Sequence, residues 1–146
     1  MNRIGTIRYR ASAVVVSNNE LLTVRLQDPY SKIVNYFVPG GKVEEFETPS
    51  ITAIRETWEE AGVRITLIEG SDLVVTYPFT WNNELFECTT TYFAAVCADR
   101  SIPNDHVDAD YNLGAQWVPL DDIDKRMGFD PNILDPVMKI VTEHFL

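Results

Sequence analysis

The sequence predicts an α+β domain or an α/β/α layered arrangement, in which helices pack on a β-sheet. Two observations lead to this class. Stretches rich in β-branched and apolar residues lie on both sides of one interior stretch with helical periodicity, and a second helical stretch comes at the end. With 146 residues, a single domain over residues 1–146 is the default, and such a chain can bury a core.

The strands are expected in two groups. Residues 8–17 and 20–27 form the first two, and Asn18-Asn19 between them is typical of a hairpin turn. A third strand is expected over residues 34–38, after which Pro39-Gly40-Gly41 predicts a loop that can approach a ligand closely. The remaining expected elements are strands at 64–77, 84–98 and 115–118, a short helix or turn at 119–122, and a helix from Pro131 or Pro136 to Phe145.

The interior helix has clear signals at both ends. Thr48 is a favourable N-cap, Pro49 suits the first helical position, and Gly62 lies where a helix stops. Four residues recur at helical spacing and are expected to form the apolar face: Ile51, Ile54, Trp58 and Ala61.

The same helix places three carboxylates close together. Glu56, Glu59 and Glu60 stand at i, i+3 and i+4, which puts them along one side of a helix that contains no Lys. Like charges at this spacing repel one another. A hard divalent cation would reverse that effect, because Mg²⁺ prefers oxygen ligands from a few carboxylates together with phosphate and water.

The segment from Gly41 to Val63 resembles the Nudix box, the signature of the Nudix hydrolases. Thr57 replaces the usual Leu, Ile or Val, and Phe46 stands where many members have a second loop Gly. The residues that fill the fixed places of the motif are Gly41, Glu47, Arg55, Glu56, Glu59, Glu60 and Gly62, with Val63 in the final aliphatic place.

The resemblance implies an α/β/α sandwich around a mixed sheet and hydrolysis of a pyrophosphate bond in a nucleoside diphosphate derivative. It implies Mg²⁺, for which Mn²⁺ can substitute, held by Glu56, Glu59 and Glu60 with the Gly41 carbonyl. Arg55 is expected to orient a carboxylate, with Glu47 or Glu56 as its partner.

The general base has two candidates. Glu59 is the first choice within the box. Many Nudix members carry an acidic residue shortly before a Trp-Val strand, and here Asp110 is nearest to Trp117 in spacing, with Asp108 second and His106 also in this stretch.

Substrate contacts are expected from aromatic faces and a few polar edges. The aromatic candidates are Tyr36, Phe37, Tyr77, Phe79 and Trp81. Tyr36 and Phe79 are the first choice among them, and Asn132 could read a purine. Nucleoside triphosphates, ribose or deoxyribose, are the first choice of substrate. Nucleotide sugars of the ADP-ribose type are the alternative, suggested by Pro78, which lies about where the ADP-ribose-cleaving members have a Pro. A non-catalytic nucleotide-binding module of this fold is the third choice, disfavoured because such modules usually lose box carboxylates.

Composition and charge limit the partners and the cellular location that can be expected. The net charge of −10 disfavours a nucleic-acid polymer as partner, although a small nucleotide can still be bound through metal ions. The sequence has no apolar run of membrane-spanning length and no signal-peptide core, which predicts no membrane partner and a cytoplasmic location. A homodimer is left open. Cys88 and Cys97 are expected on opposite faces of one strand, which argues against a disulfide between them.

Overall fold

The computed structural model describes residues 5–103 and 109–146. Its strands are β1 (Thr6–Ser17), β2 (Glu20–Gln27), β3 (Val34–Phe37), β4 (Gly40–Lys42), β5 (Thr66–Leu67), β6 (Leu73–Trp81), β7 (Glu84–Val96) and β8 (Asn112–Pro119). Its helices are α1 (Pro49–Ala61), the 3₁₀ turn η1 (Leu120–Asp122), α2 (Ile123–Met127) and α3 (Pro131–Phe145).

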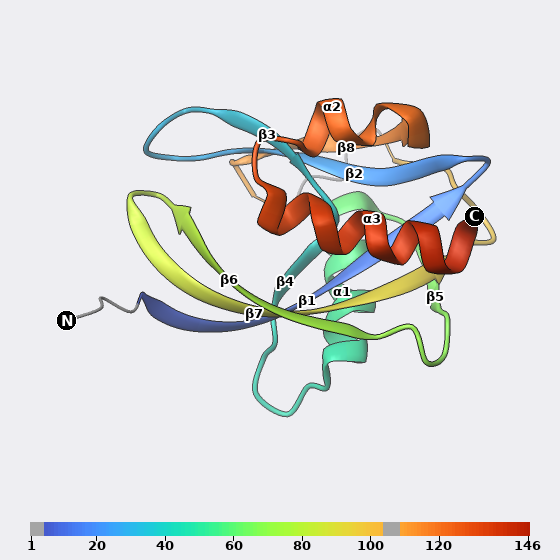
Figure 1. The fold of residues 1–146 in the computed structure, drawn as a ribbon, viewed down its shortest axis with the longest axis horizontal. Helices are drawn as coiled ribbons and strands as arrows, with labels where there is room; N and C mark the ends of the chain where they lie inside the picture. The colour runs from blue at the N-terminus through green and yellow to red at the C-terminus, as the bar shows by residue number, and fades with distance from the viewer. Residues whose placement is uncertain (1–4, 104–108) are drawn as a thin grey trace.

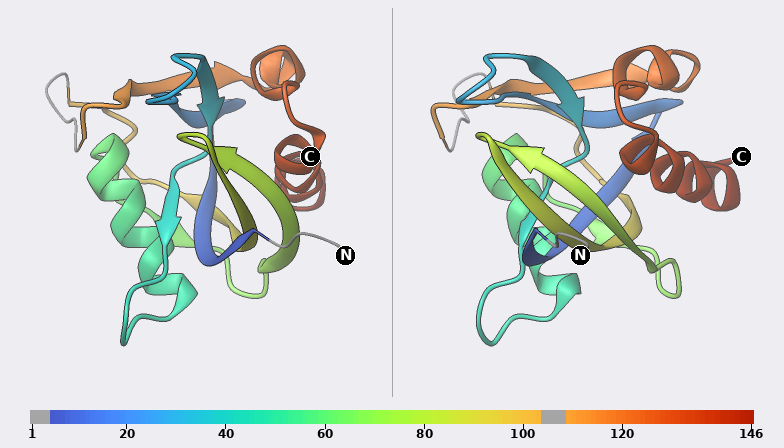
Figure 2. Two further views of the ribbon diagram at one scale, coloured as in Figure 1. Left: turned by 90° about the vertical axis from the view of Figure 1, so that its left-hand side faces the viewer. Right: turned by 60° about the vertical axis from the view of Figure 1, so that its left-hand side comes forward.

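The strands form a mixed sheet between two helical layers (Figure 1). In the left view of Figure 2, α1 lies on one side of β1 and β7, and α3 lies on the other side. The predicted α/β/α arrangement is confirmed.

Strand β1 connects the parts of the sheet. It runs parallel to β7, from the pair Thr6 and Phe86 to the pair Val15 and Ala95. It pairs antiparallel with β2 at one end and with β4 in its middle, and β2 in turn pairs with β3 and β8. Strand β6 pairs with β7 on the side away from β1. In the order of the strands, β1 therefore lies between β4 and β7, and β6 lies beyond β7.

The core has one half on each face of β1. Val14 packs in the half that includes α3, whereas Ala13 and Val15 pack in the half that includes α1. This division follows from the alternation of side chains along a strand. The two halves fix both helices relative to the sheet.

Both predicted ends of α1 are confirmed. The Thr48 side chain accepts a hydrogen bond from Ile51 N, Pro49 opens the helix, and Gly62 closes it with φ 71° while donating its N–H to the Trp58 carbonyl.

The predicted apolar face of α1 is wrong, except for Ala61. Ile51, Ile54 and Trp58 are 51%, 42% and 38% exposed. The residues that α1 buries are Thr52, Ala53, Thr57, Glu60 and Ala61. The side chains on this face are small or polar, because the face directs the carboxylates toward β4. The Thr57 hydroxyl donates a hydrogen bond to the Ala53 carbonyl. The larger apolar side chains are turned outward, and Arg64 lies 4.1 Å over the Trp58 ring.

Three expected boundaries also differ. Gly40 and Gly41 belong to strand β4 instead of a loop. The extended stretch at 64–77 divides into β5 and β6 around a turn with Gly70 at φ 76°. Strand β6 continues past Pro78, which an edge strand tolerates because the missing N–H removes no ladder bond.

The hairpin turns and the C-terminal helix agree with the sequence pattern. Asn18 and Asn19 have positive φ, as a tight hairpin turn requires. Of the two possible starts, α3 begins at Pro131, because Asp130 caps it by accepting from Asn132 N. No helix in residues 5–103 and 109–146 is long and apolar enough to cross a membrane.

Candidate active site

The site is built around the contact between strand β4 and helix α1. A side-chain carbon placed on Gly41 would overlap the carboxylate of Glu56, so only glycine lets this carboxylate lie against the backbone of β4. The contact brings the Glu56 carboxylate and the Gly41 backbone together, as the motif implies.

Glu60 is the most buried of the three glutamates, with 5% of the residue exposed. Its Oε1 accepts a hydrogen bond of 2.7 Å from the Gly40 N–H. A buried carboxylate needs such a partner. Glu60 therefore joins the helix to β4 one residue before Gly41.

Arg55 organises the other carboxylates. Its Nε and Nη2 donate to the two oxygens of Glu47 at 2.7 and 2.9 Å, a two-pronged contact. Its Nη1 donates to Glu56 at 2.8 Å and to Glu59 at 3.0 Å. The predicted pairing of Arg55 with Glu47 or Glu56 is thus confirmed for both residues.

The electrostatic effect of Arg55 differs between its partners. It lowers the pKa of Glu47 to about 2, so Glu47 is ionised throughout the physiological pH range. Burial raises the pKa of Glu56 above its ordinary value, and Arg55 and Arg10 oppose that increase. A cation bound beside Glu56 would therefore stabilise the charged form of this carboxylate.

The two candidate bases lie in different surroundings. The Glu59 side chain is 43% exposed and is held by Arg55. Asp110 is exposed, in the turn that precedes β8. That turn is attached to the helix, since Asn112 Nδ2 donates to the Glu60 carbonyl at 3.1 Å. Asp108 and His106 lie outside the described residues.

The residues present fit a hard cation in donor chemistry. Carboxylate oxygens of Glu56, Glu59 and Glu60 and the Gly41 carbonyl are ligands of the kind that Mg²⁺ prefers. Within residues 5–103 and 109–146, no three acidic, His or Cys side chains converge as a preformed cluster. In this structure Arg55 Nη1 holds both Glu56 and Glu59, and the Gly40 N–H holds Glu60.

A pocket of about 310 Å³ opens beside these carboxylates. Glu56, Glu60 and Gly41 line one part of it. Its aromatic lining comes from four elements or turns and consists of Phe37, Tyr77, Phe79, Trp81, Tyr92 and Tyr111. The aromatic rings contact one another, with Phe79 and Trp81 stacked at 6.4 Å and Tyr111 edge-on to Trp81 at 5.6 Å.

A scan against protein-family models matches the NUDIX domain over residues 7–138. The chain belongs to the Nudix family. It is a Nudix hydrolase, an enzyme that acts on phosphorus-containing anhydrides. No curated protein matches the chain.

Solved structures of this fold agree with the family assignment. A MutT NUDIX hydrolase from Burkholderia pseudomallei superposes with a TM-score of 0.68 at 21% identity, over 91% of this chain and 97% of that one. An Ap4A hydrolase from C. elegans gives 0.68 at 19% identity, over 93% and 98%. A UDP-X diphosphatase gives 0.62 at 16% identity, over 98% and 66%.

The predicted substrate residues of this Nudix hydrolase, Tyr36, Phe79 and Asn132, do not all line the same pocket. Phe79 lines the pocket beside the glutamates. Tyr36 is turned toward α2, where Arg126 lies 5.3 Å over its ring, and it does not line that pocket. Asn132 is exposed at the start of α3, where its neighbour Ile133 lines the pocket instead.

Sequence reasoning missed two groups of residues in the Nudix site. Arg8 and Arg10 line the pocket from β1, and Asn112 attaches the late turn to α1. The signal for the arginines was available, because Arg8, Arg10 and Ser12 alternate with Tyr9 and Ala11 and therefore share one face of the strand. Which partner that face meets could not be read from the alternation alone.

Proposed function

We propose that this Nudix hydrolase is a Mg²⁺-dependent pyrophosphohydrolase of nucleoside triphosphates, ribose or deoxyribose. The observation that carries the proposal is the shared pocket: Glu56 and Glu60 line the same space as a group of aromatic rings. Carboxylates of this kind suit a cation that binds phosphates, and aromatic faces suit a nucleobase.

The reaction is the attack of water on one phosphorus atom of the pyrophosphate, with a nucleotide or phosphate as leaving group. Glu56, Glu59, Glu60 and the Gly41 carbonyl would hold the cation. When bound, Mg²⁺ supplies charge neutralisation for the phosphates and makes water more acidic. Arg55 would keep Glu56 and Glu59 in place, since both accept from its Nη1.

The nucleotide sugar remains the second candidate substrate. A UDP-X diphosphatase is among the structures with this fold, and so are a MutT enzyme and an Ap4A hydrolase. The residue that suggested the sugar class, Pro78, is exposed and does not line the pocket with the glutamates. The triphosphate proposal therefore keeps the stronger support, and a non-catalytic module has less because all three box glutamates are present.

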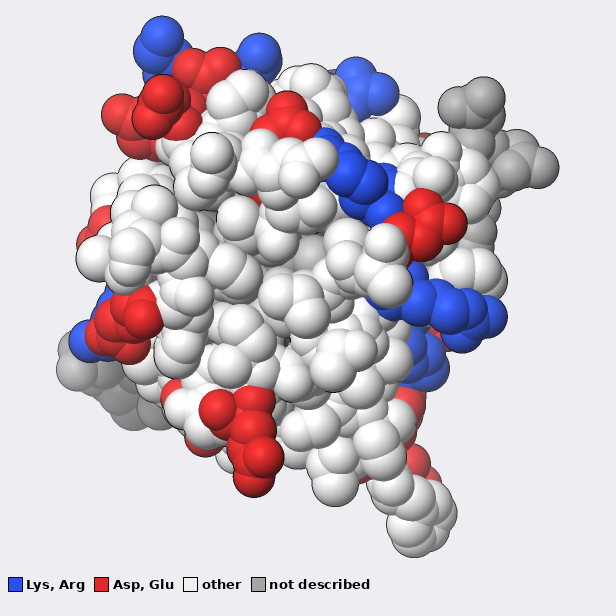
Figure 3. All heavy atoms as spheres, turned by 90° about the vertical axis from the view of Figure 1, so that its right-hand side faces the viewer, with Lys and Arg blue, Asp and Glu red and all other residues white. Residues whose placement is uncertain are grey.

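The expected partner is a small nucleotide, and the expected location is the cytoplasm. Figure 3 shows one face of the molecule, on which acidic and basic side chains lie mostly around the edge of an uncharged centre. A broad basic tract, which a nucleic-acid polymer requires, does not cover that face.

Metal dependence is the first test. With Mg²⁺ or Mn²⁺, the purified protein is expected to hydrolyse nucleoside triphosphates faster than ADP-ribose, dinucleoside polyphosphates or UDP-sugars. Phosphate, pyrophosphate and nucleotide products are measured separately, which also identifies the bond that breaks. Thorough EDTA treatment is expected to stop turnover and added Mg²⁺ to restore it. Turnover that survives EDTA contradicts the proposed mechanism, and faster hydrolysis of a sugar substrate contradicts the substrate.

The identity of the base is the second test. We propose Glu59, with Asp110 as the alternative. If Glu59 acts mainly as the base and contributes little to holding the cation, Glu59→Gln is expected to lower kcat by about 100-fold or more while Mn²⁺ affinity changes only a few-fold, because a base transfers a proton and need not hold the metal. Asp110→Asn, which alters an exposed carboxylate, is the matched comparison and is expected to be mild. The opposite pattern, with kcat lost only in Asp110→Asn, would move the base to the late turn.

A further inference from the structure

Two arginines share a face of β1 inside the pocket. Arg8 and Arg10 both line it, and both are half-buried. In the ladder, Arg10 pairs with Lys42 of β4 and with Thr90 of β7, and Arg8 pairs with Cys88 of β7. Two positions along a strand are about 7 Å apart, so both guanidinium groups can reach one extended anion.

Neither arginine is held in a direct ion pair in the part of the chain that the structure describes, although Arg10 acts on Glu56 at longer range and opposes the increase in its pKa. Arg55 has three carboxylate partners and Arg100 pairs with Glu20, whereas Arg8 and Arg10 form no hydrogen bond or ion pair among those residues. Arg8 instead lies 4.0 Å over the Phe86 ring, which holds its guanidinium group and leaves the N–H edge for another partner. Half-buried charges without a direct ion-pair partner favour an anion from outside.

The charge of the pair acts within the pocket. Cys88 also lines the pocket, and burial raises the pKa of its thiol while Arg10 and Arg8 oppose that increase. Two positive charges side by side in one pocket contrast with the net charge of the chain, which is −10. A local positive field in an acidic protein concentrates anions at that point.

The order of the strands places the pair between the two ends of the pocket. Strand β1 lies between β4, which carries Gly41, and β7, beyond which β6 carries Phe79 and Trp81. A molecule whose base lies against the aromatic rings and whose phosphates reach Glu56 would pass over Arg8 and Arg10.

We propose that Arg8 and Arg10 form an anion subsite that binds the polyphosphate chain of the substrate beside the box glutamates. The identity of the anion as substrate phosphate rests on the function proposed above. Guanidinium groups bind phosphate through paired N–H donors, so each arginine can hold a separate phosphate group. The subsite therefore favours a triphosphate, which carries more charge along its chain than the diphosphate bridge of a nucleotide sugar.

The test uses inorganic anions and metal-free protein, so that it does not depend on turnover. Tripolyphosphate, pyrophosphate and phosphate are titrated calorimetrically into the full chain in EDTA at 50 and 200 mM salt. The wild type is expected to bind tripolyphosphate most tightly and more weakly at the higher salt. Arg10→Gln is expected to weaken tripolyphosphate binding about tenfold, the effect of losing about 1.4 kcal/mol. Arg8→Gln with Arg10→Gln is expected to weaken it further and to reduce the preference for the longer anion.

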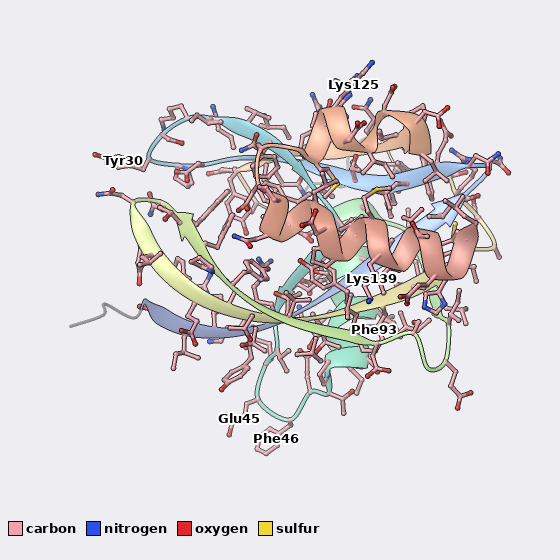
Figure 4. The ribbon with its side chains drawn as sticks, viewed as in Figure 1. Tyr30, Glu45, Phe46, Phe93, Lys125 and Lys139 are labelled. Atoms are coloured by element: carbon pink, nitrogen blue, oxygen red, sulfur yellow. The ribbon has the colours of Figure 1, made fainter. Side chains whose placement is uncertain are left out.

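Lys125→Gln is the matched control, because Lys125 is an exposed cation on α2 away from the pocket lining (Figure 4). It is expected to bind all three anions as the wild type does. Arg10→Lys keeps the charge and is expected to recover part of the affinity, and the melting temperature of each variant separates loss of binding from loss of folding. Tripolyphosphate binding that is absent in the wild type, or unchanged in the folded double variant, overturns the subsite. If binding follows the arginines but no nucleotide is hydrolysed, the subsite stands and the proposed function fails.

Discussion

Replacing Glu56 or Glu60 with Gln is expected to lower kcat/KM by about two orders of magnitude or more, the scale of losing metal-based charge stabilisation. Each change keeps the size of the side chain. In Glu60→Gln the amide oxygen can still accept the hydrogen bond from the Gly40 N–H, and in Glu56→Gln it can still accept from Arg55. The loss is therefore one of charge, with the contacts between α1 and its neighbours retained.

Folding gives the internal check for these variants. Burial already raises the pKa of Glu56, which means that the folded protein disfavours its charged form. The metal-free Glu56→Gln variant is expected to melt at or above the wild-type temperature, measured by circular dichroism. Glu45→Gln is the matched control, because Glu45 lies on the same acidic segment but at the exposed tip of the loop before α1 (Figure 4). Near-wild-type turnover in both Glu56→Gln and Glu60→Gln excludes these residues as metal ligands.

Gly41→Ala is expected to lower kcat/KM by about 100-fold, because a shift of about 1 Å in a catalytic group has effects of this size. The added methyl group would overlap the Glu56 carboxylate, and β4 cannot move away easily since Lys42 and Gly40 are paired to β1. The Glu56 side chain must therefore leave its place. Turnover and Mn²⁺ affinity are both expected to fall.

A double-mutant cycle shows whether the effect passes through Glu56. If Gly41→Ala acts by displacing that carboxylate, adding it to Glu56→Gln is expected to cost little further activity, and the two losses are strongly non-additive. Additive losses indicate that the methyl group disturbs something else in β4. Full activity in Gly41→Ala means that the contact between Gly41 and Glu56 has no catalytic consequence.

The box could be predicted from the sequence because its geometry is local. The caps of α1 and the neighbouring positions of Glu56, Glu59 and Glu60 depend only on helical spacing. The apolar face failed for the same local reason. Hydrophobicity predicted that Ile51, Ile54 and Trp58 would be buried. In the fold, Glu60 accepts from the Gly40 N–H, and this contact places the opposite face of the helix against the sheet.

The remainder of the site depends on strand register, which local patterns do not contain. Arg8 and Arg10 gain their place because β1 pairs with β4 on one side and β7 on the other. Tyr36 and Asn132 have suitable chemistry for a nucleotide, yet one is turned toward α2 and the other lies exposed at a helix start. Chemical suitability did not determine which residues share a pocket.

The parallel pairing of β1 with β7 has a consequence for how the molecule assembles. It joins Thr6 to Phe86 and Val15 to Ala95, so the chain must close a long loop before any of these contacts forms. The β4–α1 unit, in contrast, joins residues that are near in sequence. Contacts of high sequence separation slow folding, so the carboxylate half of the site can gain structure before the arginine half. A partly folded chain would then have its acidic helix formed before Arg8 and Arg10 take their places in the pocket.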